Sequence, residues 1–141
     1  MLGLTTGIGM MMLVSAINPG VSPDLNLTST VVDQPVTLEA HVREVFKDTP
    51  ILAEVARCES QFRQFGTDGK IIRGEVNKHD VGLMQINEGY HAEQAEKLGL
   101  DLYTLDGNIA YAKVLYEKEG TAPWSASKPC WSKSAAYLAM K

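Results

Sequence analysis

Cysteine is scarce in this sequence, and its basic residues form no cluster. Only 2 of the 141 residues are Cys, and the 13 Lys and Arg are scattered along a chain whose formal net charge is −4. Nucleic-acid-binding domains usually carry a basic face, so this distribution argues against a nucleic-acid partner. Internal repeats and low-complexity tracts are also absent. The length and composition are those of one ordinary globular domain that can bury a core.

The start of the chain lacks basic residues altogether, since the first is Arg43, and residues 2–17 are apolar or small. This run is slightly short for a membrane span, and the small residues at 14–16 suit signal-peptide cleavage. We therefore expect residues 1–17 to be an export signal peptide or an N-terminal membrane anchor. The alternative is a buried apolar strand or helix of the domain.

Residues 18–36 contain three prolines among Ser, Thr, Asn and Asp, which predicts a linker. The folded domain is predicted over residues 37–141. Apolar spacing and capping signals predict helices in the segments TLEAHVREVFKD (37–48), TPILAEVARCESQF (49–62), EGYHAEQAEKLG (88–99), GNIAYAKVLYEKEG (107–120) and SKSAAYLAMK (132–141).

Two local signals refine this pattern. Asn108 is a candidate cap for the helix that Gly120 closes. Asp68-Gly69 is a tight-turn signal, and KIIRGEV (70–76) suits a strand, so a small β-hairpin is predicted there. The expected fold class is α+β, mainly α.

The two cysteines are Cys58 and Cys130. An isolated pair in an exported protein is best interpreted as one disulfide. It would close a loop of about 70 residues and contribute about 4 kcal/mol in the chain-entropy model. Two unrelated buried thiols are the alternative if the protein stays in the cytosol.

Glu59 lies between Cys58 and Phe62 in an apolar helix pattern. Burying an ionised carboxylate costs several kcal/mol, so this group should be neutral, paired or at a rim. The last turn of a helix carries its negative pole, which should raise the pKa of Glu59. Glycoside cleavage needs a protonated acid for the leaving oxygen, and Glu59 is the candidate. The alternative is a solvated residue at a helix end.

The stretch DVGLMQIN (80–87) supplies a possible second half of such a site. Asp80 could face Glu59 across a cleft, or could be only a turn former. The amides of Gln85 and Asn87 alternate with apolar neighbours, as in an extended segment with one polar face. They could hold sugar hydroxyls and acetamido groups, or could satisfy local backbone groups.

The motifs in this sequence are, in order, a helix with ESxF, a hairpin, GLMQIN, and NI ahead of an Ala- and Tyr-rich helix. This order of motifs resembles the lysozyme superfamily, and bacterial lytic transglycosylases most closely. The resemblance covers roughly residues 37–131. It implies a lysozyme-like fold and cleavage of the bond between N-acetylmuramic acid and N-acetylglucosamine in peptidoglycan. Glu59 would be the acid, and then the base that lets the sugar's own 6-hydroxyl close a 1,6-anhydro ring.

The same resemblance assigns further roles. Ser60 would help to orient Glu59, and Met84 and Gln85 would line the glycan groove, although Met84 is equally a candidate for core packing. Trp124 would be either a sugar-stacking platform or a core residue. DVGLMQIN also resembles the segment of animal-type lysozymes that begins with the second carboxylate, which makes Asp80 that candidate and a hydrolytic muramidase the alternative activity.

One feature departs from the transglycosylase pattern. An Ala-Tyr-Asn triplet, whose Tyr supports the catalytic Glu, is replaced by Pro129-Cys130-Trp131. The resemblance brings this region near Glu59, which supports the disulfide with Cys58. A non-catalytic peptidoglycan-binding module is therefore a further alternative. The tyrosines that could replace the missing hydroxyl are Tyr111, Tyr116 and Tyr137.

The partners expected from this resemblance are the peptidoglycan glycan strand and, as a further candidate, an envelope secretion apparatus. The expected location is the periplasm, the cell wall or the membrane to which residues 1–17 would anchor the chain. His79 and His91 have no other ligands at metal-binding spacing, so neither a metal nor a cofactor is expected.

Overall fold

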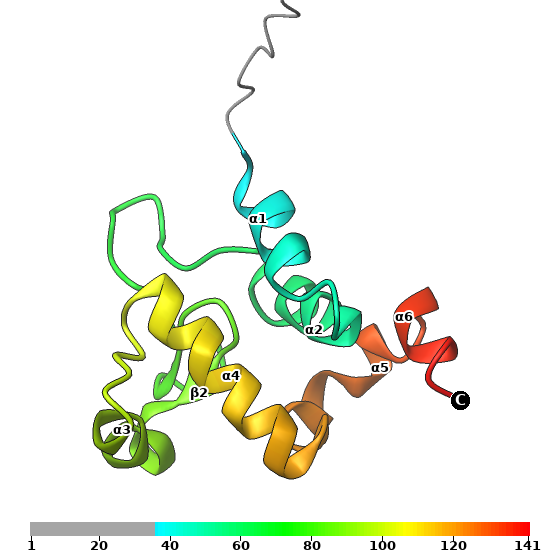
Figure 1. Ribbon diagram of the computed structural model, residues 1–141. Helices are drawn as coiled ribbons and strands as arrows, with labels where there is room; N and C mark the ends of the chain where they lie inside the picture. The colour runs from blue at the N-terminus through cyan, green and yellow to red at the C-terminus, as the bar shows by residue number, and fades with distance from the viewer. Residues whose placement is uncertain (1–35) are drawn as a thin grey trace, which may run out of the picture. The chain divides into compact units, whose positions relative to one another are not determined.

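The computed structural model describes residues 36–141. The predicted signal peptide or anchor and the linker up to residue 35 lie outside the described residues. The described part is mainly helical with one small antiparallel sheet, which confirms the α+β, mainly α class (Figure 1). The elements are α1 (Leu38–Val45), α2 (Pro50–Ser60), β1 (Asp80–Val81), β2 (Ile86–Asn87), α3 (Glu88–Lys97), α4 (Leu105–Glu119), the 3-10 helix η1 (Ala122–Ser127), α5 (Lys128–Trp131) and α6 (Ala135–Leu138).

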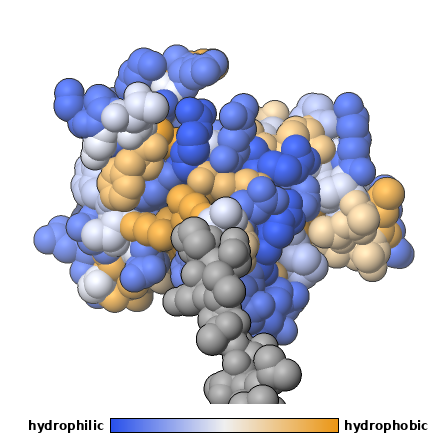
Figure 2. Space-filling model, turned by 90° about the horizontal axis from the view of Figure 1, so that it is seen from above, coloured by the Kyte–Doolittle hydropathy of each residue, from blue (hydrophilic) through white to orange (hydrophobic). Residues whose placement is uncertain are grey.

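Each of the five segments predicted to be helical contains a helix, although α6 is short. Within residues 36–141, no helix is long and apolar enough to cross a membrane. On the face seen in Figure 2, hydrophilic and apolar residues are interspersed.

The central helix is α2, which contacts α1, η1, α5 and α6. In Figure 1 it lies between α1 and α5. Apolar side chains surround its axis, so neighbouring elements can pack on several sides. Ile51, Leu52, Val55 and Ala56 are all buried, and this burial is the main source of stabilisation for a helix of 11 residues.

The sheet lies later in the chain than the sequence predicted. Gly69 does adopt a positive φ of 74° in a tight turn. However, residues 70–76 form only isolated bridges, from Ile71 to Phe65 and from Arg73 to Val81. A strand does not continue there because the chain bends at Glu75 and Val76, directly after Gly74, whose N–H donates to Asp80 O at 2.8 Å. The two-stranded sheet pairs β1 with β2 instead.

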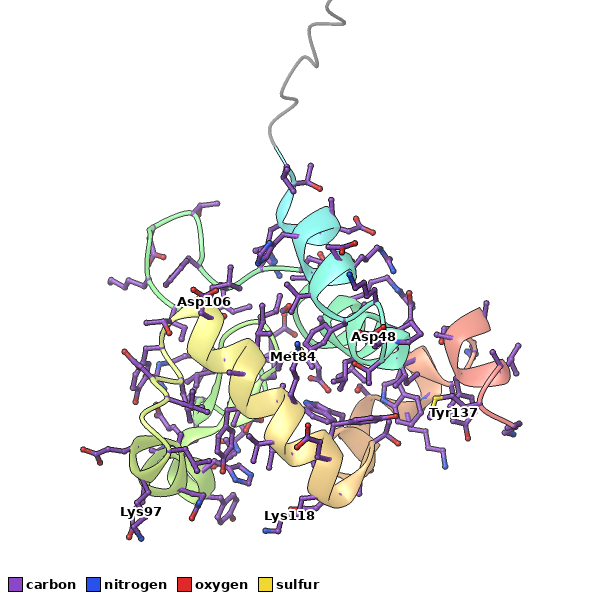
Figure 3. All side chains as sticks on the ribbon, viewed as in Figure 1. Asp48, Met84, Lys97, Asp106, Lys118 and Tyr137 are labelled. Carbon is purple, nitrogen blue, oxygen red and sulfur yellow. A yellow bond between two sulfur atoms is a disulfide. The ribbon has the colours of Figure 1, made fainter. Side chains whose placement is uncertain are left out.

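Residues 84–87 were predicted to be extended, but only Ile86 and Asn87 form a strand, because Met84 and Gln85 lie in the turn Gly82–Gln85 that joins β1 to β2. Gln85 has a positive φ of 48°, which breaks the alternation of inward and outward side chains. Met84 is fully buried, and Figure 3 places it in the interior between α2 and α4.

Two buried amides hold this turn in place. Gln64 Oε1 accepts a hydrogen bond from Leu83 N–H at 2.7 Å, and Asn108 Oδ1 accepts one from Met84 N–H at 2.9 Å. Asn108 was predicted to cap a helix, but α4 begins earlier and is capped by Thr104, whose Oγ1 accepts from a backbone N–H at 3.1 Å. The amide of Asn108 is therefore free to bind the turn.

Gly82 lies between these amides with a φ of +73°. A Cβ atom there would lie 2.6 Å from Asn108 Nδ2 and 2.7 Å from Gln64 Oε1. We predict that Gly82→Ala lowers the free energy of unfolding by about 3 kcal/mol or more, since it adds left-handed strain and displaces buried hydrogen bonds. Urea titration followed by circular dichroism would measure the loss.

The matched control is Gly99→Ala. Gly99 has a similar φ of +70°, but nothing lies within 4 Å of its Cβ position. Its loss should be the backbone cost alone, about 1–2 kcal/mol. Equal losses in the two variants would contradict the proposed crowding at Gly82.

Candidate active site

A groove of about 1240 Å³ is lined by the end of α2, the segment 63–78 and the end of η1. Glu59 and Asp80 both line it, together with Gln85 and Ser127. The fold therefore brings the two carboxylates predicted from sequence to one concave surface. Such a surface is the usual place for an active site.

Glu59 occupies the last turn of α2, as predicted. The helix ends immediately after it because Gln61 and Phe62 adopt left-handed conformations, with φ of 56° and 57°. Consecutive non-glycine residues in this region are costly and occur preferentially at functional sites. Glu59 lines the groove directly before this sharp end.

Burial is the main cause that raises the pKa of Glu59 above its ordinary value. The negative charge of Asp80 raises it further, whereas a hydrogen bond from Ser127 opposes the shift. The environment thus favours the protonated form of this carboxyl. A general acid at neutral pH needs this property.

Ser127 makes the direct contact with Glu59. Its hydroxyl donates to Glu59 Oε1 at 2.7 Å. Ser127 lies at the end of η1 and is 68 residues away in sequence. Sequence analysis did not identify this residue. Its position three residues before Cys130 is a usable signal, because a disulfide to Cys58 brings that region to α2.

Asp80 begins β1 and is held by two side-chain amides. Its Oδ1 accepts from Asn77 Nδ2 at 3.2 Å and from Asn87 Nδ2 at 2.7 Å. Asn87 thus orients the second carboxylate and is not among the groove-lining residues. Gln85 does line the groove, although its Nε2 donates to Gly82 O at 2.9 Å.

Of the remaining predicted site residues, Ser60 lines the groove, whereas Met84 and Trp124 do not. Ser60 Oγ donates to Ala56 O at 3.0 Å and accepts from Arg63 N–H at 3.2 Å, so it stabilises the helix end and does not orient Glu59. Met84 and Trp124 are buried in the core. Their side chains cannot line the groove, because Met84 lies in the buried turn and Trp124 donates its indole N–H to Met84 O at 2.8 Å.

Among the described residues, none of the three candidate tyrosines donates a hydrogen bond to Glu59. Tyr111 Oη lies 3.2 Å from His91 Nδ1, and the ring of Tyr137 packs edge-on against Trp131. The hydroxyl that contacts Glu59 therefore comes from a serine.

The predicted disulfide between Cys58 and Cys130 is confirmed, with Cα atoms 6.0 Å apart and a sequence separation of 72. Figure 3 shows it as a yellow bond next to Tyr137. It joins α2 to α5, and Cys58 precedes Glu59 directly. The bond therefore fixes the helix that carries the candidate acid.

An ion-pair cluster anchors the long segment that lines the groove. Arg73 Nη1 donates to Glu88 Oε1 at 2.7 Å, and Tyr103 Oη donates to Glu88 Oε2 at 2.6 Å. The hydrogen bond from Arg73, with that from Tyr103, lowers the pKa of Glu88 to about 2. Arg73 is thereby tied to the first turn of α3.

In the part of the chain from residue 36 onward, no group of three or more His, Cys, Asp or Glu side chains is arranged to hold a metal ion. Comparisons with protein-family models, curated protein sequences and solved structures found no match. The function is therefore inferred from the groove and its two carboxylates.

Proposed function

We propose that this chain is a peptidoglycan lytic transglycosylase with a lysozyme-like fold. The observation that carries the proposal is Glu59, a carboxyl group with a raised pKa that lines a large groove together with Asp80. A structural role does not require a carboxyl group whose pKa is raised by burial. Glycoside cleavage does.

In the first step, Glu59 donates its proton to the oxygen that links N-acetylmuramic acid to N-acetylglucosamine. Ser127 holds Oε1, so Oε2 is the oxygen available to carry the proton. The C–O bond breaks as the oxygen is protonated, and positive charge develops on the anomeric carbon. The ionised Asp80 in the same groove is suited to stabilise this charge.

In the second step, the carboxylate of Glu59 removes the proton from the 6-hydroxyl of the muramic acid. That oxygen attacks the anomeric carbon and closes the 1,6-anhydro ring. Glu59 regains the proton it lost, so the acid is ready for another cycle. No cofactor is needed for this sequence of proton transfers.

Hydrolysis is the second candidate activity. It is favoured by the two amides, from Asn77 and Asn87, that fix Asp80 in the groove. A carboxylate oriented in this way resembles the second carboxylate of a muramidase. In a muramidase, water takes the place of the sugar's 6-hydroxyl and attacks the anomeric carbon. A non-catalytic peptidoglycan-binding module would need neither acid.

We further propose that the protein acts outside the cytoplasm, in the periplasm or at the cell wall, because its disulfide is compatible with export. Residues 1–17 would serve as signal or anchor. Peptidoglycan would be the substrate. An envelope secretion apparatus is a candidate partner, because such an apparatus needs a local opening in the cell wall.

Product analysis tests the activity. We expect the purified 141-residue chain to release muropeptides with 1,6-anhydro ends from peptidoglycan sacculi, detected by mass spectrometry. Reducing ends would instead identify a muramidase. A protein that sediments with sacculi but releases nothing would be the binding module, and the proposed enzyme would be wrong.

A further inference from the structure

The hydroxyl of Ser127 has two acceptors within reach. Its Oγ lies 2.7 Å from Glu59 Oε1 and 3.2 Å from the backbone O of Trp124. A serine hydroxyl carries one proton, so it can form a strong hydrogen bond with only one acceptor at a time. The shorter contact to Glu59 becomes the stronger bond when that carboxyl is ionised, since charge-assisted hydrogen bonds are shorter and stronger.

We propose that Ser127 is a positioning residue for Glu59, which fixes one carboxyl oxygen and strengthens its hydrogen bond as the acid gives up its proton. This inference rests on the proposed function, in which Glu59 is the proton donor. It assigns to Ser127 the supporting role for which sequence analysis expected a tyrosine.

The balance of effects at Glu59 explains why such a donor is needed. Burial and the charge of Asp80 both raise the pKa of the carboxyl, and the Ser127 hydrogen bond lowers it. An acid that is too weak transfers its proton slowly, although it is fully protonated. Ser127 thus keeps a buried acid able to ionise during the reaction.

The surrounding structure holds Ser127 in place from both sides along the chain. Before it, the indole N–H of Trp124 donates to Met84 O at 2.8 Å. After it, Cys130 is bonded to Cys58, which is next to Glu59. The hydroxyl is therefore anchored to the same helix end that carries its partner, which is what pre-organisation requires.

The test compares Ser127→Ala with Ser127→Thr and with Ser125→Ala, a control at an exposed serine in the same 3-10 helix. Ser127→Ala should lower kcat by about tenfold, which is typical for the loss of one hydrogen bond to a charged group. The alkaline limb of its pH–rate profile should move to higher pH, because the pKa of Glu59 rises without the donor. Ser127→Thr, which keeps a hydroxyl, should restore both properties, and Ser125→Ala should behave as the wild type.

A second readout does not depend on activity. The ¹³C NMR shift of the Glu59 carboxyl carbon should titrate at higher pH in Ser127→Ala than in the wild type and in Ser125→Ala. An unchanged titration or an unchanged pH profile would overturn the inference, even if the chain cleaves peptidoglycan. If the titration moves but no cleavage product appears, the contact is established and the proposed function fails.

Discussion

Glu59→Gln is expected to reduce the release of soluble muropeptides from sacculi by about 10²- to 10⁴-fold, the usual contribution of a general acid. The amide keeps the size of the side chain and can still accept the hydrogen bond from Ser127 Oγ. It cannot donate a proton to the leaving oxygen or accept one from the 6-hydroxyl. Both proposed steps therefore lose their essential group, while the groove keeps its shape. Mass spectrometry of the released products would measure the loss.

The matched control is Glu93→Gln, at an exposed glutamate on α3 that pairs only with Lys97 among the contacts of the described residues. This variant should retain wild-type activity. Both variants should keep the wild-type melting temperature and the ability to sediment with sacculi. Full activity of Glu59→Gln would refute the assignment of Glu59 as the acid.

Removal of the disulfide by the double substitution Cys58→Ala and Cys130→Ala should lower the free energy of unfolding by about 4 kcal/mol. The bond closes a long loop, since its cysteines have a sequence separation of 72. Without it the unfolded chain gains conformational entropy that folding must overcome. Urea titration of the variant and of the wild type would give the difference.

Dithiothreitol provides the control for this second prediction. The reductant should destabilise the wild type to about the level of the double variant and should leave the variant unchanged. A difference below about 1 kcal/mol between wild type and variant would mean that the disulfide contributes little. A further loss in the reduced variant would point to an effect of the reagent that does not involve this bond.

Local sequence signals were sufficient for the parts of the site that depend on neighbours in the chain. The apolar spacing of residues 50–58 and the proline at the first helical position predicted α2, and thereby placed Glu59 in its last turn. The disulfide followed from two isolated cysteines. The meeting of Glu59 with Asp80 in one groove was anticipated from the resemblance of two motifs.

The errors concern side chains whose direction is set by distant contacts. Met84 was a candidate both for the groove and for the core, and the turn that the amides of Gln64 and Asn108 hold buries it in the core. Asn108 looked like a cap because capping is a local property. Its hydrogen bond to Met84 N–H spans 24 positions, and sequence spacing does not encode such a contact.

Ser127 was missed for the same reason. Serine is common in loops, and nothing in the residues beside it indicates a carboxyl partner 68 positions away. The strain at Gln61 and Phe62 was equally invisible, because neither residue type favours a positive φ. The contact of Ser127 becomes apparent only when α2 and η1 are packed together.

The position of the disulfide also gives the groove a particular topology. The residues that line the groove run from Cys58 to Ser127, and all of them fall within the segment that the bond between Cys58 and Cys130 closes. All groove-lining residues thus belong to one covalent ring, which the backbone from residue 58 to residue 130 and the disulfide form together. A single backbone cut in that ring, for example beside the fully exposed Val76, leaves the two fragments joined through sulfur. Glu59 and Asp80 lie on opposite sides of such a cut, and the disulfide would keep both carboxylates in one molecule.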